Sequence, residues 1–512
     1  MTDRPAAWMG RGLFLAGVFL MVTGDWPQST LFPMRWPQSV VTWPWLAPAF
    51  PVVSSLLIVA IVVLGVARPT TADFRRTPMA LLTAAFLLSM TFVAGILLAL
   101  IGDWPRSTLL PTSWAGPVAF LTWPWLYLAL IALSFVPMLS SGVLRVGRVA
   151  TADFLHTPMA LLTAAFLLSV AFSQVPALSQ WAFGCFLAIA GFGFAVARIV
   201  EDETCMAALP GVMAAAAVFL AVRVLVWRFD EGLTIQPYLT FNNAWVGKPQ
   251  IVWALNLLAP LLLARFVSER PIAAAIYGAA WLLTAGAVGV LFSTTGAVTL
   301  TLTTLALCLL NRDYWRRWLP PLVGIVALQF GLIAVSDTMR THVVAGLIHP
   351  DRDPGIQLRQ DVWRQTVRII TDHPITGIGL GTYDDVAMRY GPPADSFFFH
   401  RGWHAHNTFL HVFVETGAAG FLAWCYVGAV IVGFWLRRWR GGDRLSRLNS
   451  SAGLCVVIAF VTLSMTEVMI AARVDASLRL NLTWALLVVY GIRLASPRPS
   501  TSLPFRDEGT LR

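Results

Sequence analysis

Charged residues are scarce in this chain, and lysine is almost absent from it. Asp, Glu, Lys and Arg make up 12% of the 512 residues, hydrophobic residues make up 57%, and Lys248 is the only lysine. Cysteine is also rare, and the five cysteines lie in or beside apolar segments. A soluble domain could not bury so much apolar surface, so that class is excluded. We also expect no disulfides and no metal cluster built from cysteine.

Long apolar segments recur along most of the chain. They are roughly 18–25 residues long, the length at which a helix spans about 30 Å of hydrocarbon. The sequence therefore predicts an all-α polytopic membrane protein with about fourteen transmembrane helices and one large extracytoplasmic loop that carries short helices. The predicted parts are an N-terminal transmembrane region at 1–180, central transmembrane helices at 181–335, a large periplasmic loop at 336–405, C-terminal transmembrane helices at 406–495 and a cytoplasmic tail at 496–512. Within the C-terminal part we expect helices at about 406–436, 450–471 and 476–495.

The N-terminal region contains a duplicated two-helix repeat, at about 24–101 and 102–181. Gly24–Leu31 returns with one change as Gly102–Leu109, and Thr77–Ser89 returns unchanged as Thr157–Ser169. The Trp-Pro pairs of the repeat are expected at the outer face of the membrane that the protein spans, because indole rings favour the interface between lipid and water. Stacking of these tryptophans on a sugar is the alternative. So close a repeat indicates recent duplication of a helix pair.

The net charge of +10 comes from arginines that gather in alternating loops and at both termini. This asymmetry is the positive-inside pattern, and it predicts a multi-pass protein with N- and C-termini in the cytoplasm. The basic charge therefore indicates topology, and we expect no nucleic-acid partner. Two loops on the opposite side carry cations that the pattern does not explain, among them Arg228, Lys248 and Arg359. An anionic ligand at the outer face is the simplest reason for them.

Arg359 belongs to a short helix predicted at Ile356–Thr371 within the large loop. It shares a face of that helix with Trp363 and Thr366, whereas Arg368 points the opposite way. Arg359 is therefore expected to face the membrane-embedded body. Because an isolated buried guanidinium is costly, it should meet an anion, either a carboxylate or a ligand phosphate. A structural ion pair with an aspartate is the alternative.

Histidines concentrate around the end of the same loop. Seven of the eight histidines fall between His342 and His411. Asn407 or Thr408 can cap the helix that follows, which puts His406 at a positive helix end. This position disfavours the imidazolium and leaves a neutral imidazole, the form that a general base needs. We therefore predict that His406 is the catalytic base.

The neighbours of His406 are predicted to support it. His404 lies in the preceding turn, and Gly417 is expected to let another helix pack closely beneath. Glu415 faces away from His406 and should pair with His411 four residues earlier, as a structural contact. His400, His404 and His406 also have a spacing that permits a metal site, but the sequence positions no acidic ligand with them, so we expect no metal.

Glycines recur at Gly377, Gly379 and Gly381. The segment superficially resembles a nucleotide-binding loop, but the strand and helix that such a loop requires are missing around it. A glycine-rich turn that returns the chain to the membrane is the favoured interpretation.

The order of these motifs resembles the O-antigen ligase and polymerase superfamily. The resemblance rests on Arg359 with Trp363, His373-Pro374 with Gly377–Thr382, His404-x-His406-Asn407 and Gly417-x-x-Gly420, over about residues 240–440. It implies a GT-C-like, inverting glycosyltransferase of the bacterial cell inner membrane, without cofactor or metal. The implied donor is a glycan on undecaprenyl diphosphate, and the implied acceptor is a hydroxyl of lipid A-core or of a growing glycan on the periplasmic face.

The resemblance also implies roles for single residues. His406 would activate the acceptor hydroxyl, Arg359 would bind the diphosphate with Lys248 and Arg228, and His404, Asn407, Glu415 and Gly417 would support the site. One departure stands out, because Thr295 occupies the position where the family often has an arginine. A ligase in lipopolysaccharide biosynthesis is the first hypothesis. A polymerase of O-antigen or exopolysaccharide is the second, and a non-catalytic polysaccharide transporter is the third.

Overall fold

The computed structural model describes residues 5–23, 153–231, 248–337, 340, 348, 354–391, 404–468 and 475–496. The regular elements in these ranges are all helices, which confirms the all-α prediction for this part of the chain. The first repeat copy, the first half of the second copy (102–152) and the tail at 497–512 lie outside the described residues. The count of about fourteen transmembrane helices, made from apolar segment lengths, therefore stays a prediction.

Seven described helices are long and apolar enough to cross a membrane. They are α8 (Pro176–Ile199), α9 (Glu203–Glu231), α11 (Lys248–Ser268), α12 (Pro271–Val290), α14 (Trp315–Val335, preceded by the 3-10 turn Arg312–Tyr314), α18 (Thr408–Gly441) and α19 (Arg444–Ser464). Shorter apolar helices accompany them, namely α1 (Pro5–Thr23), α7 (His156–Ala171, preceded by the 3-10 turn Asp153–Leu155), α13 (Thr294–Leu310) and α20 (Asp475–Ala495).

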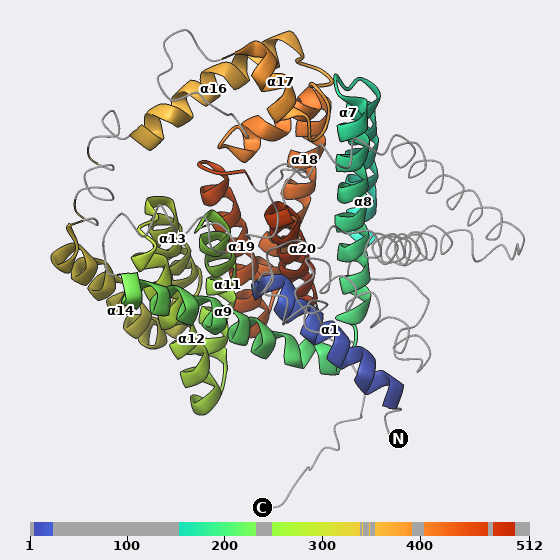
Figure 1. Cartoon of the computed structure of the whole chain (residues 1–512). Helices are drawn as coiled ribbons and strands as arrows, with labels where there is room; N and C mark the ends of the chain where they lie inside the picture. Colours follow the sequence, from blue (N-terminus) through green and yellow to red (C-terminus); the bar gives the residue numbers. More distant parts are fainter. Residues whose placement is uncertain are drawn as a thin grey trace, which may run out of the picture.

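The centre of the bundle is α11. Its side chains are apolar around most of its circumference, and residues such as Trp253, Leu258 and Leu263 are almost wholly buried. A helix that is apolar on all sides is stable only when other helices surround it. α11 accordingly packs against α9, α12, α13, α19 and α20 (Figure 1).

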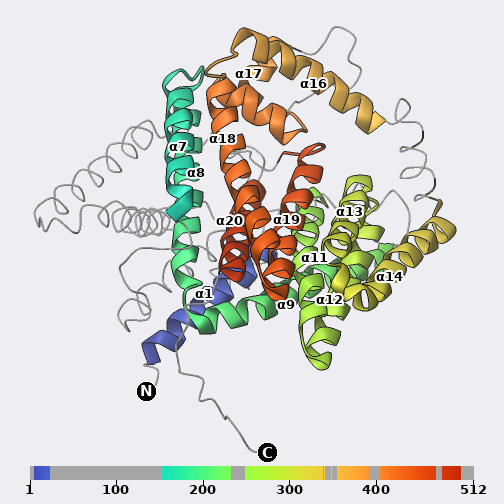
Figure 2. The same ribbon diagram turned by 180° about the vertical axis from the view of Figure 1, so that it is seen from behind.

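Two helices of the large loop lie across one end of the bundle, α16 (Pro354–Asp372) and α17 (Tyr383–Tyr390) (Figures 1 and 2). α16 confirms the helix predicted at 356–371. It buries Val362 and Ile369 on one face and exposes Arg364 and Arg368 on the other. Because the buried face packs on α17 and on the first turns of α18, the two helices are seated over the beginning of α18.

The glycine-rich segment is a turn, as predicted, and it packs against a kink in α18. Gly377, Gly379 and Gly381 have φ values of +68°, +113° and +72°, and Gly417, where α18 kinks, has +62°. The Ile378 amide donates to the Val414 carbonyl at 3.0 Å. These left-handed conformations are accessible to glycine at little cost.

The packing partner predicted for Gly417 was wrong. A backbone segment, Pro374–Gly379, lies against it in place of a second helix. The Ala418 amide donates to the Pro374 carbonyl at 2.8 Å, and a Cβ added at Gly417 would lie 2.2 Å from the Ile375 oxygen. The kink exposes backbone groups of α18 that an unbroken helix would satisfy internally, so a polar loop can pair with them.

Gly417→Ala is expected to destabilise the protein by at least about 1–3 kcal/mol, because it combines a strained φ with a backbone clash. The measurement is the thermal unfolding midpoint of the detergent-solubilised chain. Gly428→Ala, in the same helix, is the matched control, since a Cβ there meets nothing within 4 Å. Equal midpoints for the two variants would contradict the strain at Gly417.

Candidate functional site

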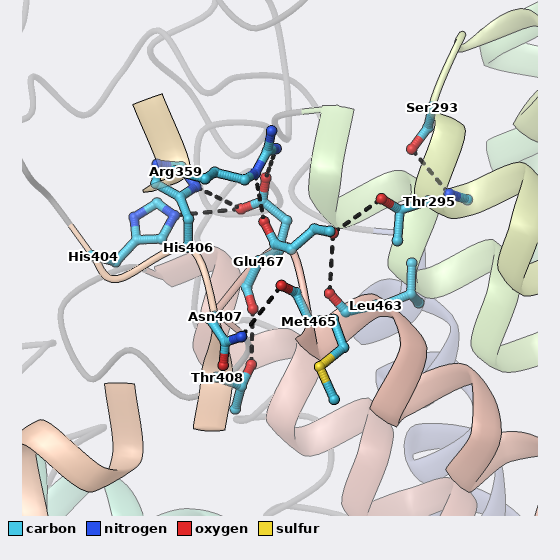
Figure 3. Close-up of polar contacts among 12 residues, drawn as sticks. Ser293, Thr295, Arg359, His404, His406, Asn407, Thr408, Leu463, Met465 and Glu467 are labelled. Carbon is cyan, nitrogen blue, oxygen red and sulfur yellow. Dashed lines mark hydrogen bonds and ion pairs between the residues drawn. The ribbon is translucent and has the colours of Figure 1, made fainter. Parts of the chain in front are cut away.

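The central residue of the candidate site is Glu467, which contacts the other site residues from the turn that follows α19. The helix predicted at 450–471 was too long, because α19 ends at Ser464. The amides of Thr466 and Glu467 both donate to the Leu463 carbonyl, at 3.1 and 3.2 Å, and this tightened turn closes the helix. Glu467 therefore lies beside Asn407 and Thr408 at the beginning of α18, and Arg359 of α16 reaches it (Figure 3).

Asn407 fixes the beginning of α18, as one of the two predicted caps. Its side-chain oxygen accepts from the amides of Phe409 and Leu410 at 2.9 and 3.1 Å. The next residue, Thr408, donates its hydroxyl to the Glu467 carbonyl at 2.9 Å. The helix start and the turn after α19 are thereby tied together.

His406 precedes the cap in a left-handed conformation, with φ of +47°. Such a conformation costs a non-glycine residue of order 1 kcal/mol or more, and histidine tolerates it better than most. The reversal of the backbone places the rings of His404 and His406 side by side, with centroids 4.1 Å apart. Both rings face the Glu467 carboxylate (Figure 3).

The two histidines share one carboxylate oxygen. His404 Nε2 lies 3.3 Å from Glu467 Oε2, and His406 Nδ1 lies 3.5 Å from the same atom. The second distance is long for a hydrogen bond, as contacts in catalytic sites often are before substrate binds. His406 Nδ1 is buried and has no closer hydrogen-bond partner.

Arg359 reaches the same carboxylate from α16. Its Nη2 lies 3.4 Å from Glu467 Oε1, and its Nε donates to the Thr466 carbonyl at 3.2 Å. The prediction that Arg359 faces the bundle and meets an anion is confirmed, with a glutamate where the alternative had named an aspartate. The Arg359 side chain is 28% exposed, so it lies at the edge of the site.

The charges of this cluster favour a neutral histidine beside an ionised glutamate. Burial lowers the pKa of His406, and the nearby His404 and Arg359 lower it further, against the opposing effect of Glu467. Burial alone would raise the pKa of Glu467, but the contacts with His404 and His406 outweigh it and hold that pKa well below its usual range. At neutral pH the imidazole of His406 can therefore accept a proton.

Comparison with known protein families identifies the segment that carries most of this site. Residues 272–425 match the family model described as O-antigen ligase. This match supports the resemblance of the chain to the O-antigen ligase superfamily. The matched segment includes Arg359, His404 and His406 and ends before Glu467. No curated protein matched the chain.

Glu415 and His411 form the predicted pair inside the segment that matches the family model. His411 Nε2 lies 3.3 Å from Glu415 Oε1, and both side chains are buried. The carboxylate also accepts from the amides of Gly381 and Tyr383, at 2.8 and 3.2 Å. It therefore holds the glycine-rich turn at the beginning of α17, while a supporting role for Glu415 in the site stays a prediction.

The second repeat copy packs against the same part of the chain. Ser169, near the end of α7, donates its hydroxyl to the Glu415 carbonyl at 2.7 Å. Gln174 donates its amide to the Ile378 carbonyl at 2.9 Å and contacts His373 through its side chain at 2.7 Å. The duplicated helix thus packs against α18 and the turn that supports it.

Thr295, the predicted departure from the family, lies next to the turn that carries Glu467. It is in the first turn of α13, and the Thr466 hydroxyl donates to its hydroxyl at 3.0 Å (Figure 3). Thr466 is the neighbour of Glu467. Thr295 therefore contacts the turn that carries Glu467, and its replacement of a family arginine stays a prediction.

Two further predicted cations have no described side chains. Arg228 is near the end of α9 and Lys248 is the first residue of α11, but their side chains, like the whole of His400, lie outside the described residues. Their assignment to a diphosphate site stays a prediction.

The sequence interpretation missed Glu467. A signal for it was present, because Glu467 is the only acidic residue between Asp443 and Asp475, in an otherwise apolar stretch. An ionisable residue in such a segment is costly unless it is paired, and it therefore marks a candidate site.

Proposed function

We propose that this protein is an inner-membrane glycosyltransferase that moves a glycan from undecaprenyl diphosphate to an acceptor hydroxyl on the periplasmic face, as an O-antigen ligase. The observation that carries the proposal is the convergence of Arg359 and His406 on Glu467 in a chain that matches the O-antigen ligase family model. A neutral base and a cation beside one carboxylate supply the two functions that displacement of a diphosphate requires.

His406 acts as the general base in this proposal. With its Nδ1–H directed at Glu467 Oε2, the lone pair of Nε2 is available to accept the proton of the acceptor hydroxyl. Glu467 holds the ring in this tautomer and stabilises the imidazolium that forms, as a carboxylate does for the histidine of a catalytic triad. The left-handed backbone at His406 fixes the direction of the ring.

The leaving group is stabilised on the other side of the reacting carbon. The acceptor oxygen forms a bond to the anomeric carbon, the bond from that carbon to the diphosphate oxygen breaks, and the diphosphate departs with the electron pair. Arg359 is suited to bind the developing charge, because a planar guanidinium matches phosphate oxygens. Lys248 and Arg228 are the candidates for a second cation, which Thr295 does not provide.

The surface glycans that remain after deletion of the gene distinguish a ligase from its alternatives. Gel analysis of surface glycans in the deletion strain is expected to show loss of the whole ladder linked to lipid A. Collapse of the ladder to a single repeat unit would identify a polymerase of the same superfamily. Retained glycan export by an Arg359→Ala, His406→Ala double variant would support a transporter and contradict catalysis.

Transfer is expected to persist at pH values below the ordinary pKa of histidine. A base works only when it is neutral, and the pKa of His406 is lowered by burial, so protonation should stop the reaction only in more acidic solution. The initial rate of transfer, measured against pH, should fall on an acid limb whose midpoint lies below about 6.5. A midpoint above that value would contradict the assignment of His406.

A further inference from the structure

We propose that His404, His406 and Glu467 also bind a divalent transition-metal ion of the zinc class, and that the bound ion switches the transferase off. The inhibitory part rests on the proposed function, whereas binding of the ion does not. The reason for expecting no metal here was that no acidic ligand could be placed with the histidines from sequence. Glu467 supplies that ligand.

The distances suit a tetrahedral ion. Zinc binds imidazole nitrogen and carboxylate oxygen at about 2.0–2.2 Å, so two of its tetrahedral ligands lie about 3.3 Å apart. His404 Nε2 and His406 Nδ1 lie 3.3 and 3.5 Å from Glu467 Oε2. All three ligand atoms fall within 4.8 Å of one another.

The chemistry of the donors points to the same class of ion. Two imidazoles and one carboxylate form a ligand set that zinc uses where a fourth position stays open to water. His406 Nδ1 is buried, and its contact with Glu467 Oε2 at 3.5 Å is long for a hydrogen bond, so a bound ion would give it a closer partner. Arg359 contacts the other carboxylate oxygen, Oε1, so Oε2 can serve the ion while the ion pair persists.

A metal at this position would inactivate the base directly. A neutral imidazole carries its proton on one nitrogen and a lone pair on the other. An ion on Nδ1 of His406 forces the proton onto Nε2, so Nε2 has no lone pair for the acceptor hydroxyl. The ion also occupies the carboxylate oxygen that would otherwise hold the catalytic tautomer.

Binding is tested on the full chain, purified in detergent with an affinity tag that contains no histidine and freed of metal with a chelator. Titration with Co²⁺ should produce the visible absorption of a tetrahedral site and saturate at one ion per chain. Glu467→Gln, His404→Asn and His406→Asn should each weaken binding by at least about tenfold. His156→Gln is the control. His156 of α7 stacks on Phe194 of α8, so its replacement should leave metal binding intact.

Loss of metal binding in a variant could result from misfolding, so a variant that gains a new absorption band is also needed. His404→Cys should retain the ion and add a thiolate-to-cobalt charge-transfer band, which arises only if residue 404 is a ligand. No tetrahedral spectrum for the wild type, or an unchanged spectrum for Glu467→Gln, would overturn the site.

The inhibitory role has its own readout. Saturating Zn²⁺ should reduce wild-type transfer by at least about tenfold and a chelator should restore it, in line with loss of a general base. The rate of His404→Asn, relative to its own metal-free rate, should be insensitive to the same zinc concentration. If the protein binds cobalt but neither the wild type nor any variant transfers glycan, the metal site is supported and the proposed function is rejected. Transfer that zinc does not inhibit would overturn the switch.

Discussion

Replacement of His406 by asparagine is expected to lower the rate of glycan transfer by about 10²–10⁴-fold, the usual contribution of a general base. Asparagine is chosen because it tolerates the left-handed conformation found at this position, with φ of +47°. The backbone before the Asn407 cap is thereby kept, and the proton acceptor alone is removed. His406→Ala should lose transfer to a similar degree and some stability in addition.

The rate is measured with membranes or purified protein at matched amounts of inserted chain. His156→Gln, outside the cluster around Glu467, controls for the loss of a histidine. Transfer by His406→Asn close to the wild-type rate would remove His406 from the mechanism, whatever the effect of the alanine variant.

Glu467→Gln is expected to reduce transfer by at least about a hundredfold, because an amide cannot stabilise the imidazolium or hold its tautomer as a carboxylate does. It should also change the pH profile. Glu467 is the neighbour that raises the pKa of His406 against burial, so its neutralisation should move the acid limb to still lower pH. A residue with a purely structural role would lower the amount of folded protein without this shift.

Glu269→Gln is the matched control for the loss of a glutamate. Glu269 pairs with Arg265 at 3.1 Å through partly exposed side chains, and such pairs contribute little to stability. The control should transfer at the wild-type rate. An equal loss in both variants, or a Glu467→Gln profile with an unmoved acid limb, would contradict the proposed role of Glu467.

Local features of the site could be predicted from sequence because their causes are local. The helix that carries Arg359 follows from its pattern of apolar residues, and the cap at Asn407 follows from side-chain chemistry at a helix start. The pair of His411 and Glu415 follows from their spacing along a helix. Each of these depends on residues within about one or two turns of one another.

The position of Glu467 at the centre of the site depends on contacts between residues that are distant in sequence. Glu467 meets Arg359 across 108 positions of the chain. Hydropathy extended α19 past its end, because Val468 and the residues after it are as apolar as the helix itself. The kink at Gly417 was missed for a related reason: the loop that satisfies the opened backbone comes from outside the helix. Tertiary packing decides such features.

The most direct test of the central claim is a reconstituted transfer reaction in metal-free buffer. Purified protein is given a defined glycan on undecaprenyl diphosphate and a lipid A-core acceptor, and the product is analysed for its amount and its anomeric configuration. We predict a transferred glycan with inverted configuration from the wild type, and its loss from His406→Asn. Retained configuration, or the same yield from His406→Asn as from the wild type, would contradict direct displacement with His406 as the base.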